Sequence, residues 1–205
     1  MDVQYPLQHV VCLDFETGGH DASVVPVLSV AICRPEGVWP TLEAQWLVRE
    51  SESALACCDP RALEVNGHCL DEVRAEGKSP RQVALELADQ LDKVRDSDGR
   101  VYVVAHNAPF DVAFLDRLFR LAGLGRPPQM LWVCSMALAL ALRWARGRGP
   151  YSLSSLARRY GVPTPDAHTA LGDARTLADV LPYLLSELGP GPRRASAPRP
   201  QKELP

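Results

Sequence analysis

The sequence predicts an α/β fold, with one mixed sheet and helices packed on its faces. Three observations favour this fold class. The first third of the chain contains three segments with strand composition, separated by turn residues, as in an antiparallel meander. From residue 80 onward, helical and strand patterns alternate, which is typical of parallel connections. The length of 205 residues and the hydrophobic content of 46% suit one domain with a sizeable core.

The meander is expected from three β-branched or alternating segments. They cover residues 10–16, 24–33 and 42–48, and the first ends in two acidic residues. Turn residues at 17–20 and 34–37 separate them. The three segments should therefore pair in sequence order as neighbouring antiparallel strands.

Helix signals begin after the meander. A short helix and turn are expected at residues 63–68. Ser79 should be the N-cap of the next helix, with Pro80 at its first position and Gln82 completing a capping box. Apolar residues then recur at helical spacing as far as Val94.

The second half of the chain alternates between strand and helix. Residues 101–105 form a fully apolar segment, as expected for a strand buried on both faces. A helix should then open with Pro109 near its first position. Apolar spacing predicts a long amphipathic helix over 170–188, which Pro182 should kink.

Two acidic residues close the first strand. Because side chains alternate along a strand, Asp14 and Glu16 should point the same way, with Cα atoms roughly 7 Å apart. Leu13 and Phe15 should point into a core. Adjacent carboxylates repel one another unless a cation lies between them, so this pair is a candidate divalent-metal site.

Two helix starts supply further acids. Asp111 precedes a stripe of apolar residues at helical spacing, which places it on the core-facing side of its helix: Phe114, Leu115, Leu118 and Ala122. Asp173 lies at the edge of the apolar stripe of the last helix, and His168 lies just before that helix. Strand ends and helix starts cluster at one rim of an α/β sheet, so these side chains should converge.

Three stretches resemble the motifs of the DEDDh 3′–5′ exonucleases. They are Asp14-Phe15-Glu16-Thr17-Gly18, His106-Asn107-Ala108-Pro109-Phe110-Asp111 and His168-Thr169-Ala170-Leu171-Gly172-Asp173. The likeness is greatest to the DnaQ-like group, which includes the proofreading epsilon subunit of bacterial DNA polymerase III. It covers roughly residues 9 to 186, and residues 151–162 look like the helix before the third motif.

The resemblance implies a ribonuclease H-like fold with a five-stranded sheet. It also implies two divalent cations, Mg²⁺ or Mn²⁺, held by four carboxylates: Asp14, Glu16, Asp111 and Asp173. His168 stands five residues before the last acid, where this group has its general base. An unperturbed histidine titrates near pH 6.5, which suits that role.

The resemblance further implies contacts to the substrate. The residues expected there are Thr17, Gly18, His106, Asn107 and Phe110. The backbone of the first motif would hold the terminal 3′-hydroxyl. Phe110 would pack either against the terminal bases or into the core. His106 and Asn107 would shape the turn, with Asn107 either capping the helix or facing the substrate.

The expected function is a metal-dependent 3′–5′ exonuclease that removes 5′-mononucleotides from single-stranded or frayed DNA 3′ ends, in proofreading or repair. One alternative is an RNA 3′-end-trimming enzyme on the same fold. Another is a catalytically silent, nucleic-acid-binding subunit of a polymerase, against which the intact acid set argues. Two departures bear on the substrate subclass: Gly18 replaces a common Thr, and Cys134 replaces a common Asp.

Composition limits the remaining classes. A net charge of −3 and a pI near 6.0 exclude a strongly basic nucleic-acid coat, although two bound divalent ions would offset that charge. The first residues lack signal-peptide character, and the longest apolar run, residues 130–142, is shorter than the roughly 20 residues of a membrane span. A cytoplasmic protein without membrane association is expected.

Three other features have ordinary interpretations. The six cysteines form no C-x-x-C pair, and Cys57, Cys58, His68 and Cys69 match no zinc motif, so reduced thiols are expected. The arginines of a predicted loop, at positions 143, 146 and 148, either guide a phosphate backbone or are simply solvated. The domain is expected to span residues 1–188, with 189–205 as a disordered Pro/Arg-rich tail that could tether a polymerase or another partner.

Overall fold

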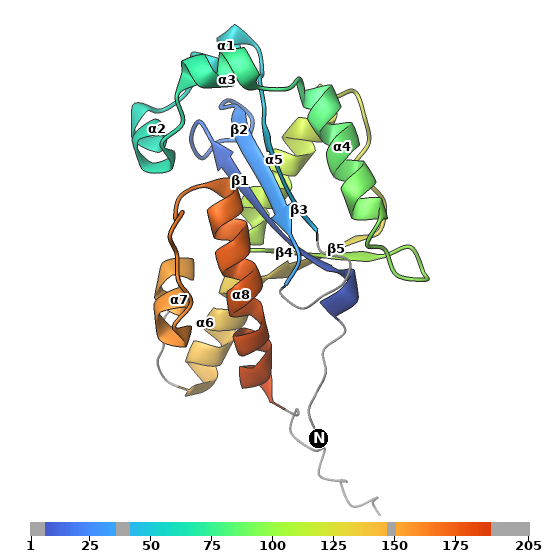
Figure 1. Ribbon diagram of the computed structural model, residues 1–205, viewed down its shortest axis with the longest axis vertical. Helices are drawn as coiled ribbons and strands as arrows, with labels where there is room; N and C mark the ends of the chain where they lie inside the picture. Colours follow the sequence, from blue (N-terminus) through green and yellow to red (C-terminus); the bar gives the residue numbers. More distant parts are fainter. Residues whose placement is uncertain (1–6, 36–41, 147–150, 190–205) are drawn as a thin grey trace, which may run out of the picture.

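A computed structural model shows a central sheet with helices on both faces (Figure 1). The structure describes residues 7–35, 42–146 and 151–189. The strands are β1 (Val10–Thr17), β2 (Val27–Cys33), β3 (Glu43–Leu47), β4 (Val101–Ala105) and β5 (Met130–Cys134). The helices are η1 (Leu7–His9, a 3₁₀ turn), α1 (Glu52–Leu55), α2 (Pro60–Asn66), α3 (Leu70–Glu76), α4 (Pro80–Asp92), α5 (Ala108–Leu121), α6 (Ser135–Arg146), α7 (Leu153–Tyr160) and α8 (Ala170–Leu188).

The sheet is mixed, and its strands lie in the order β3-β2-β1-β4-β5. β2 pairs antiparallel with both β1 and β3, whereas β4 pairs parallel with both β1 and β5. The predicted meander and the parallel strands that follow it are therefore confirmed. β1 lies in the middle of the sheet, but β4 pairs only with Val10–Cys12, so β2 alone pairs with its carboxyl end.

Side chains of β1 point alternately to the two faces of the sheet, and each face packs into a separate hydrophobic core. Leu13 and Phe15 belong to the core beneath α4 and α5, together with Leu87 and Phe114. Cys12, on the opposite face, packs against the buried side of α8. Asp14 and Glu16 continue the Cys12 face toward the start of α8, as the period of two requires.

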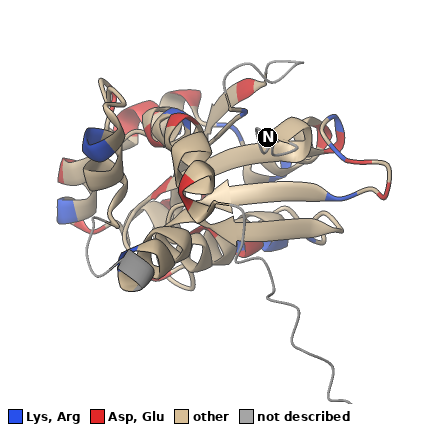
Figure 2. Cartoon of the chain, turned by 90° about the horizontal axis from the view of Figure 1, so that it is seen from below, with Lys and Arg blue, Asp and Glu red and all other residues tan. Residues whose placement is uncertain are grey.

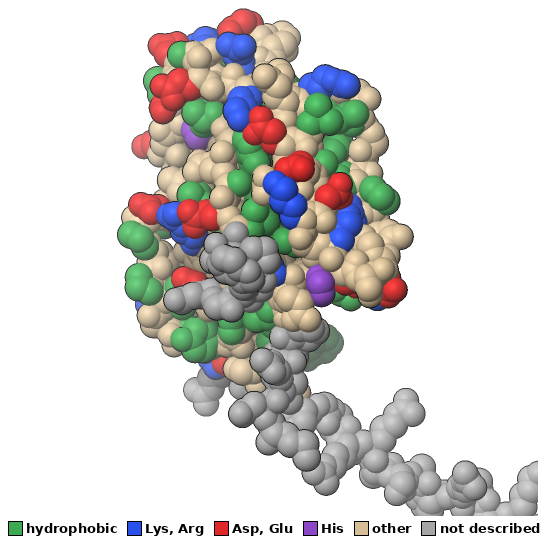
Figure 3. Space-filling model, turned by 45° about the vertical axis from the view of Figure 1, so that its right-hand side comes forward, with side chains coloured by type: hydrophobic (Ala, Val, Ile, Leu, Met, Phe, Trp, Pro, Cys, Tyr) green, Lys and Arg blue, Asp and Glu red, His purple; other side chains and the backbone are tan. Residues whose placement is uncertain are grey.

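Charge is almost absent from the strands. Figure 2 shows acidic and basic residues mainly on helices and loops. Within the strands the exceptions are Asp14, Glu16 and Glu43. On the face shown in Figure 3, basic side chains lie among acidic ones rather than forming one broad basic patch. No helix of the described residues is long and apolar enough to cross a membrane.

Several predicted boundaries shift in the structure. β1 continues through Thr17, so the two acids lie inside the strand rather than at its end. β2 begins at Val27 rather than Val24, because residues 18–26 form a loop in which Val24 is 50% exposed. The capping box at Ser79 is confirmed. α8 is helical on both sides of Pro182, and the kink there stays a prediction.

The predicted arginine loop is wrong in part. Arg143 and Arg146 belong to α6, which continues the apolar run that follows β5. The Arg143 guanidinium lies 5.5 Å from the ring centroid of Tyr151. Three predicted features lie wholly or partly outside the described residues: Arg148, residues 36 and 37 of the predicted turn, and the tail from 190 onward. The domain boundary at 188 therefore stays a prediction.

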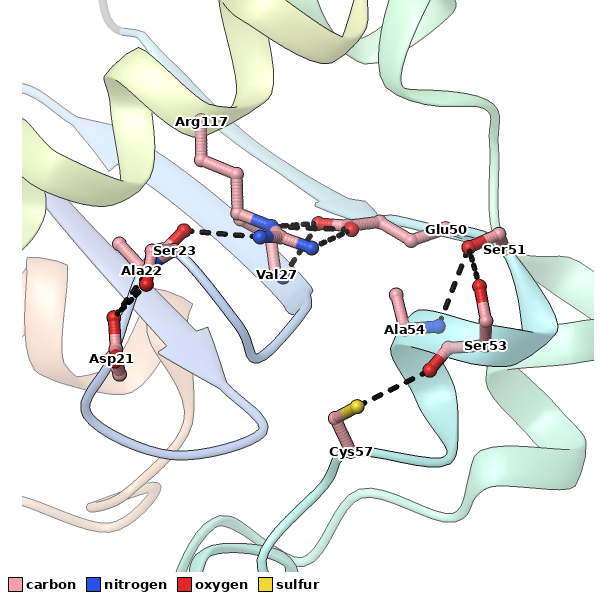
Figure 4. A network of polar contacts seen from close by, with 10 residues as sticks. All are labelled: Asp21, Ala22, Ser23, Val27, Glu50, Ser51, Ser53, Ala54, Cys57 and Arg117. Carbon is pink, nitrogen blue, oxygen red and sulfur yellow. Dashed lines mark hydrogen bonds and ion pairs between the residues drawn. The ribbon is translucent and has the colours of Figure 1, made fainter.

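A buried ion pair fixes the loop between β1 and β2 (Figure 4). The Arg117 side chain of α5 donates to both carboxylate oxygens of Glu50, at 2.6–3.2 Å, and to the carbonyl of Ala22 at 3.0 Å. Glu50 also accepts a hydrogen bond from the backbone N–H of Val27 at 2.9 Å. Both charged side chains are buried, with exposed fractions of 8% and 2%. The pair joins α5, the loop and the start of β2.

Candidate active site

Three carboxylates meet between the end of β1 and the start of α8. Asp14, Glu16 and Asp173 each offer one carboxylate oxygen, and these three oxygens lie within 4.8 Å of one another. The strand supplies two acids on one face, and the first turn of α8 supplies the third. Carboxylate oxygens are the ligands that Mg²⁺ prefers, so this set can hold a divalent ion. No other such cluster of His, Cys, Asp or Glu is found among the described residues. The described structure therefore places no metal-binding cluster at Cys57, Cys58, His68 and Cys69.

Asp111 joins the group from the other side of the sheet. It lies in the first turn of α5 and is 2% exposed, as its predicted place at the head of the buried stripe requires. Its carboxylate accepts hydrogen bonds from its own backbone N–H and from that of Phe15. These bonds hold it beside Asp14, whose pKa its charge perturbs.

The acids are electrostatically costly without a cation. Burial raises the pKa of Asp14 well above its usual range, and the charges of the three neighbouring carboxylates raise it further. Burial also raises the pKa of Glu16 to about 7, with a second contribution from Asp173 and a partial offset from a hydrogen bond with Asn66. Divalent ions would relieve this repulsion, so the residues present fit the metal centre that the resemblance implies.

His168 lies in the loop just before α8. It is exposed and adopts a left-handed backbone conformation, with φ of 64°. Its backbone N–H donates a hydrogen bond to the Asp173 carboxylate, which lowers the pKa of that acid against the larger effect of burial. Thr169, the N-cap of α8, accepts from the Gly172 N–H at 3.1 Å and donates to the Asp166 carbonyl at 2.8 Å. The cap therefore holds the histidine loop against the helix.

Gly172 should be indispensable for this arrangement. A Cβ at this position would overlap the carbonyl oxygen of Asp166, which is backbone and cannot rotate away. We expect Gly172→Ala to destabilise the protein by about 1–3 kcal/mol and to lower nuclease activity, because the loop with His168 must shift. Thermal unfolding and a cleavage assay would measure both effects. Gly125→Ala is the matched control, since a Cβ there meets nothing within 4 Å; equal behaviour of the two variants would contradict the prediction.

A cavity of about 520 Å³ surrounds the acids, a size in the range of small-molecule sites. It brings together all five predicted catalytic and metal-binding residues. Its lining residues are Asp14, Phe15, Glu16, Thr17, Gly19, His20, Asp59, Arg61, Ala62, Val65, Asn66, His106, Phe110, Asp111, His168 and Asp173.

The predicted substrate residues divide into two groups. Thr17, His106 and Phe110 line the cavity, whereas Gly18 and Asn107 are not among its lining residues. Gly18 packs so closely that an added Cβ would lie 2.6 Å from the Cys58 sulfur. Asn107 is the N-cap of α5 but its side chain makes no capping hydrogen bond, so the predicted cap is correct only in position.

His106 and Phe110 are both fixed by other protein groups. The His106 Nδ1 atom lies 2.9 Å from the Ser135 hydroxyl, and a hydrogen bond to the Tyr151 carbonyl partly offsets the lowering of its pKa by burial. Phe110 packs on Phe114, with ring centroids 4.7 Å apart, and on the edge of His20. Phe110 therefore packs on the core and also lines the cavity, and its predicted contact with the terminal bases stays a prediction.

The α2 side of the cavity was missed by sequence reasoning. Asp59, Arg61, Ala62 and Val65 line it, and Asn66 reaches from the end of α2 to the Thr17 carbonyl at 3.0 Å. The short helix and turn expected at residues 63–68 were a weak signal for this region, but nothing in the local sequence marked Asp59, Arg61 or Ala62 as cavity residues.

Comparison with known proteins identifies the family. The profile of the Exonuclease family (RNase_T) matches residues 11–181. The chain belongs to this family. It is 31% identical over 170 residues to the DNA polymerase III PolC-type protein of Thermotoga maritima, and this alignment covers 83% of the chain and 11% of that protein. It is also 32% identical over 129 residues to the DNA polymerase III epsilon subunit of Haemophilus influenzae. This alignment covers 62% of the chain and 46% of the subunit. The predicted resemblance to the DnaQ-like group is therefore confirmed.

Solved structures confirm the ribonuclease H-like fold. Exonuclease I of E. coli in complex with a dT13 oligonucleotide superposes with a TM-score of 0.68 at 18% identity, over 87% of this chain and 40% of that one. Exonuclease X in complex with 5′-overhanging duplex DNA gives a TM-score of 0.60 at 23% identity, over 86% of this chain and 91% of that one. This chain spans less than half the length of the two curated relatives described above.

Proposed function

We propose that this protein is an exonuclease that hydrolyses DNA from the 3′ end, releases 5′-mononucleotides and acts on single-stranded or frayed ends in proofreading or repair. The observation that carries this proposal is the convergence of Asp14, Glu16, Asp111, Asp173 and His168 on one cavity. DNA is favoured over RNA because the similar proteins are DNA polymerase III proteins and because exonucleases I and X were solved with DNA.

Two divalent ions are part of this proposal. When bound, Mg²⁺ or Mn²⁺ ions would neutralise the phosphate, activate the attacking water and stabilise the leaving 3′ oxygen. Asp14 would contact both ions, Glu16 and Asp173 would complete the one on the nucleophile side, and Asp111 would complete the other. The hydrogen bonds that position Asp111 beside β1 and Asn66 beside Glu16 pre-orient these ligands.

The protein's own groups move the proton and hold the substrate. His168 accepts the proton of the attacking water, while the oxygen of that water bonds to phosphorus and the bond to the 3′ oxygen breaks. The loop position of His168, exposed at the cavity, leaves its ring free to approach a bound strand. Thr17 and Phe110 flank the place where the terminal nucleotide would lie.

Association with a polymerase belongs to the same proposal. In the PolC-type relative the matching stretch covers 11% of a polymerase chain, and the epsilon relative is named as a polymerase subunit. The exonuclease would then act on the 3′ end that a polymerase partner presents in the cytoplasm.

A gel assay tests the proposed activity. It uses a 5′-labelled single-stranded DNA and an RNA of the same sequence, each with Mg²⁺ or Mn²⁺. A ladder that shortens from the 3′ end on DNA is the expected result. Faster shortening of RNA would replace the DNA assignment with an RNA-trimming one. No cleavage of either strand with either metal would overturn the enzyme proposal and favour a silent binding subunit.

Replacing His168 should separate catalysis from metal binding. We expect His168→Asn to lower kcat by about a hundredfold or more, the usual contribution of a positioned base. All four carboxylates remain, so Mn²⁺ should still raise the Tm of the variant as it raises that of the unsubstituted protein. Unchanged kcat, or loss of the Mn²⁺ effect on Tm, would remove His168 from the role of general base.

A further inference from the structure

A single arginine stands out at the rim of the cavity. Among the described residues that line it, Arg61 is the only lysine or arginine, whereas five lining residues are acidic. The Arg61 guanidinium has five N–H donors, yet it forms no hydrogen bond or ion pair with another described residue; only its backbone N–H is engaged, with the Asp59 carboxylate at 2.9 Å. Most other basic side chains of the described chain have such partners: Arg74, Lys78, Lys93, Arg95, Arg100, Arg117, Arg126, Arg159 and Arg175.

The helix that carries Arg61 is anchored at both ends to the metal-binding strand. The Asp59 N–H donates to the Gly18 carbonyl at 2.7 Å, and the Asn66 side chain donates to the Thr17 carbonyl at 3.0 Å. Figure 1 shows α2 beside the end of β1. Arg61 lies between these two anchors, so its backbone is held at a fixed place relative to Asp14 and Glu16.

One face of α2 is turned to the cavity. Arg61, Ala62 and Val65 line it, at positions i, i+1 and i+4, which share a side of a helix. Val65 is 61% exposed, so the face combines one cation with open apolar surface. A nucleic-acid strand has the complementary chemistry, because its phosphates alternate with apolar sugar and base surfaces.

Arg61 does not lie against the carboxylates that would hold the metals. No nitrogen of its guanidinium is within 4.0 Å of a carboxylate oxygen in the described chain. The scissile phosphate belongs with the metals and those acids, so Arg61 is placed for a neighbouring phosphate. We infer that Arg61 binds the phosphodiester immediately upstream of the scissile one, as a phosphate subsite of the cavity. This inference rests on the proposed function.

Kinetics with a charge-neutral phosphate test the subsite. We expect Arg61→Ala to raise KM for a single-stranded oligonucleotide about tenfold or more, with kcat within about twofold, as loss of a hydrogen bond to a charged group predicts. An oligonucleotide with an uncharged methylphosphonate at the upstream position should raise KM of the unsubstituted protein similarly. It should cause no further rise in Arg61→Ala, because the two changes remove the same contact.

A minimal substrate separates the subsite from a general defect. The p-nitrophenyl ester of thymidine 5′-monophosphate contains one phosphodiester and no upstream phosphate. Its kcat/KM should be the same for Arg61→Ala and the unsubstituted protein. Arg120→Ala is the matched control, since Arg120 is exposed near the far end of α5 and does not line the cavity.

Binding without cleavage gives a second readout. Fluorescence anisotropy of a labelled oligothymidylate measures its affinity for the protein at several salt concentrations. The measurement compares His168→Asn with the double variant that also carries Arg61→Ala. The slope of log affinity against log salt should fall by about 0.7 when Arg61 is removed, the value for one phosphate contact to a single strand. Arg61→Lys should keep this slope, because it keeps the charge.

Three results would overturn the inference. Arg61→Ala could have the same KM and salt slope as Arg120→Ala, or it could lose as much kcat/KM on the p-nitrophenyl ester as on the oligonucleotide. The third is a methylphosphonate that raises the KM of Arg61→Ala as much as it raises that of the unsubstituted protein. Failure of the proposed function looks different. The unsubstituted protein would then cleave neither substrate, while anisotropy would still report whether Arg61 contributes to strand binding.

Discussion

Asp14→Asn should lower the rate of DNA cleavage by about 10⁴-fold. Asp14 is the acid whose pKa responds to all three neighbouring carboxylates, so it lies at the centre of the proposed metal set. Asparagine keeps its shape but loses the charge that would bind both ions. The fall corresponds to roughly 5–6 kcal/mol of transition-state stabilisation, in line with the several kcal/mol that a metal centre supplies. Single-turnover cleavage of a 5′-labelled oligonucleotide measures it.

The same variant should be no less stable than the unsubstituted protein without metal. In EDTA at pH 8, removal of one of four clustered charges lowers their mutual repulsion, so Tm should stay equal or rise. Mn²⁺ should raise the Tm of the unsubstituted protein but not that of the variant. Asp89→Asn is the control, because Asp89 is an exposed acid of α4 paired with Lys93. A Tm response to Mn²⁺ that survives in Asp14→Asn would contradict the metal assignment.

Arg117→Met should lower the free energy of unfolding by about 3–5 kcal/mol. The substitution keeps an apolar side chain of comparable length but leaves the buried Glu50 carboxylate without a cation, which is the costly way to break a buried ion pair. It also removes the hydrogen bond to the Ala22 carbonyl. Urea unfolding followed by circular dichroism measures the change.

Two further variants separate the buried charge from the lost packing. Arg117→Met with Glu50→Gln should recover part of the loss, because no unpaired charge remains and the glutamine oxygen can still accept from the Val27 N–H. Arg126→Met breaks an exposed pair with Asp116 and should cost at most about 1 kcal/mol. A loss in Arg117→Met no larger than that in Arg126→Met would show that the pair is not a main stabilising contact.

Local patterns predicted the parts of the fold that depend on neighbouring residues. The capping box at Ser79 and Gln82 involves residues three apart, and it formed as expected. Alternation placed Leu13 and Phe15 in the core and Asp14 and Glu16 on the opposite face. Helical spacing placed Asp111 on a buried side. Boundaries were less accurate, because the packing of residues 18–26 decides where β2 starts.

The sequence by itself determined the order of strands and helices, and it predicted the acids and the histidine that line the cavity, because periodicity, caps and short motifs involve residues close together in the chain. Only the tertiary structure decided which distant segments complete the cavity. Arg61 and Asn66 reach it because α2 is tied to the end of β1, and Glu50 meets Arg117 across 67 positions of the chain. Such pairs leave no local pattern: they come together only when burial of the two cores closes the loops between them.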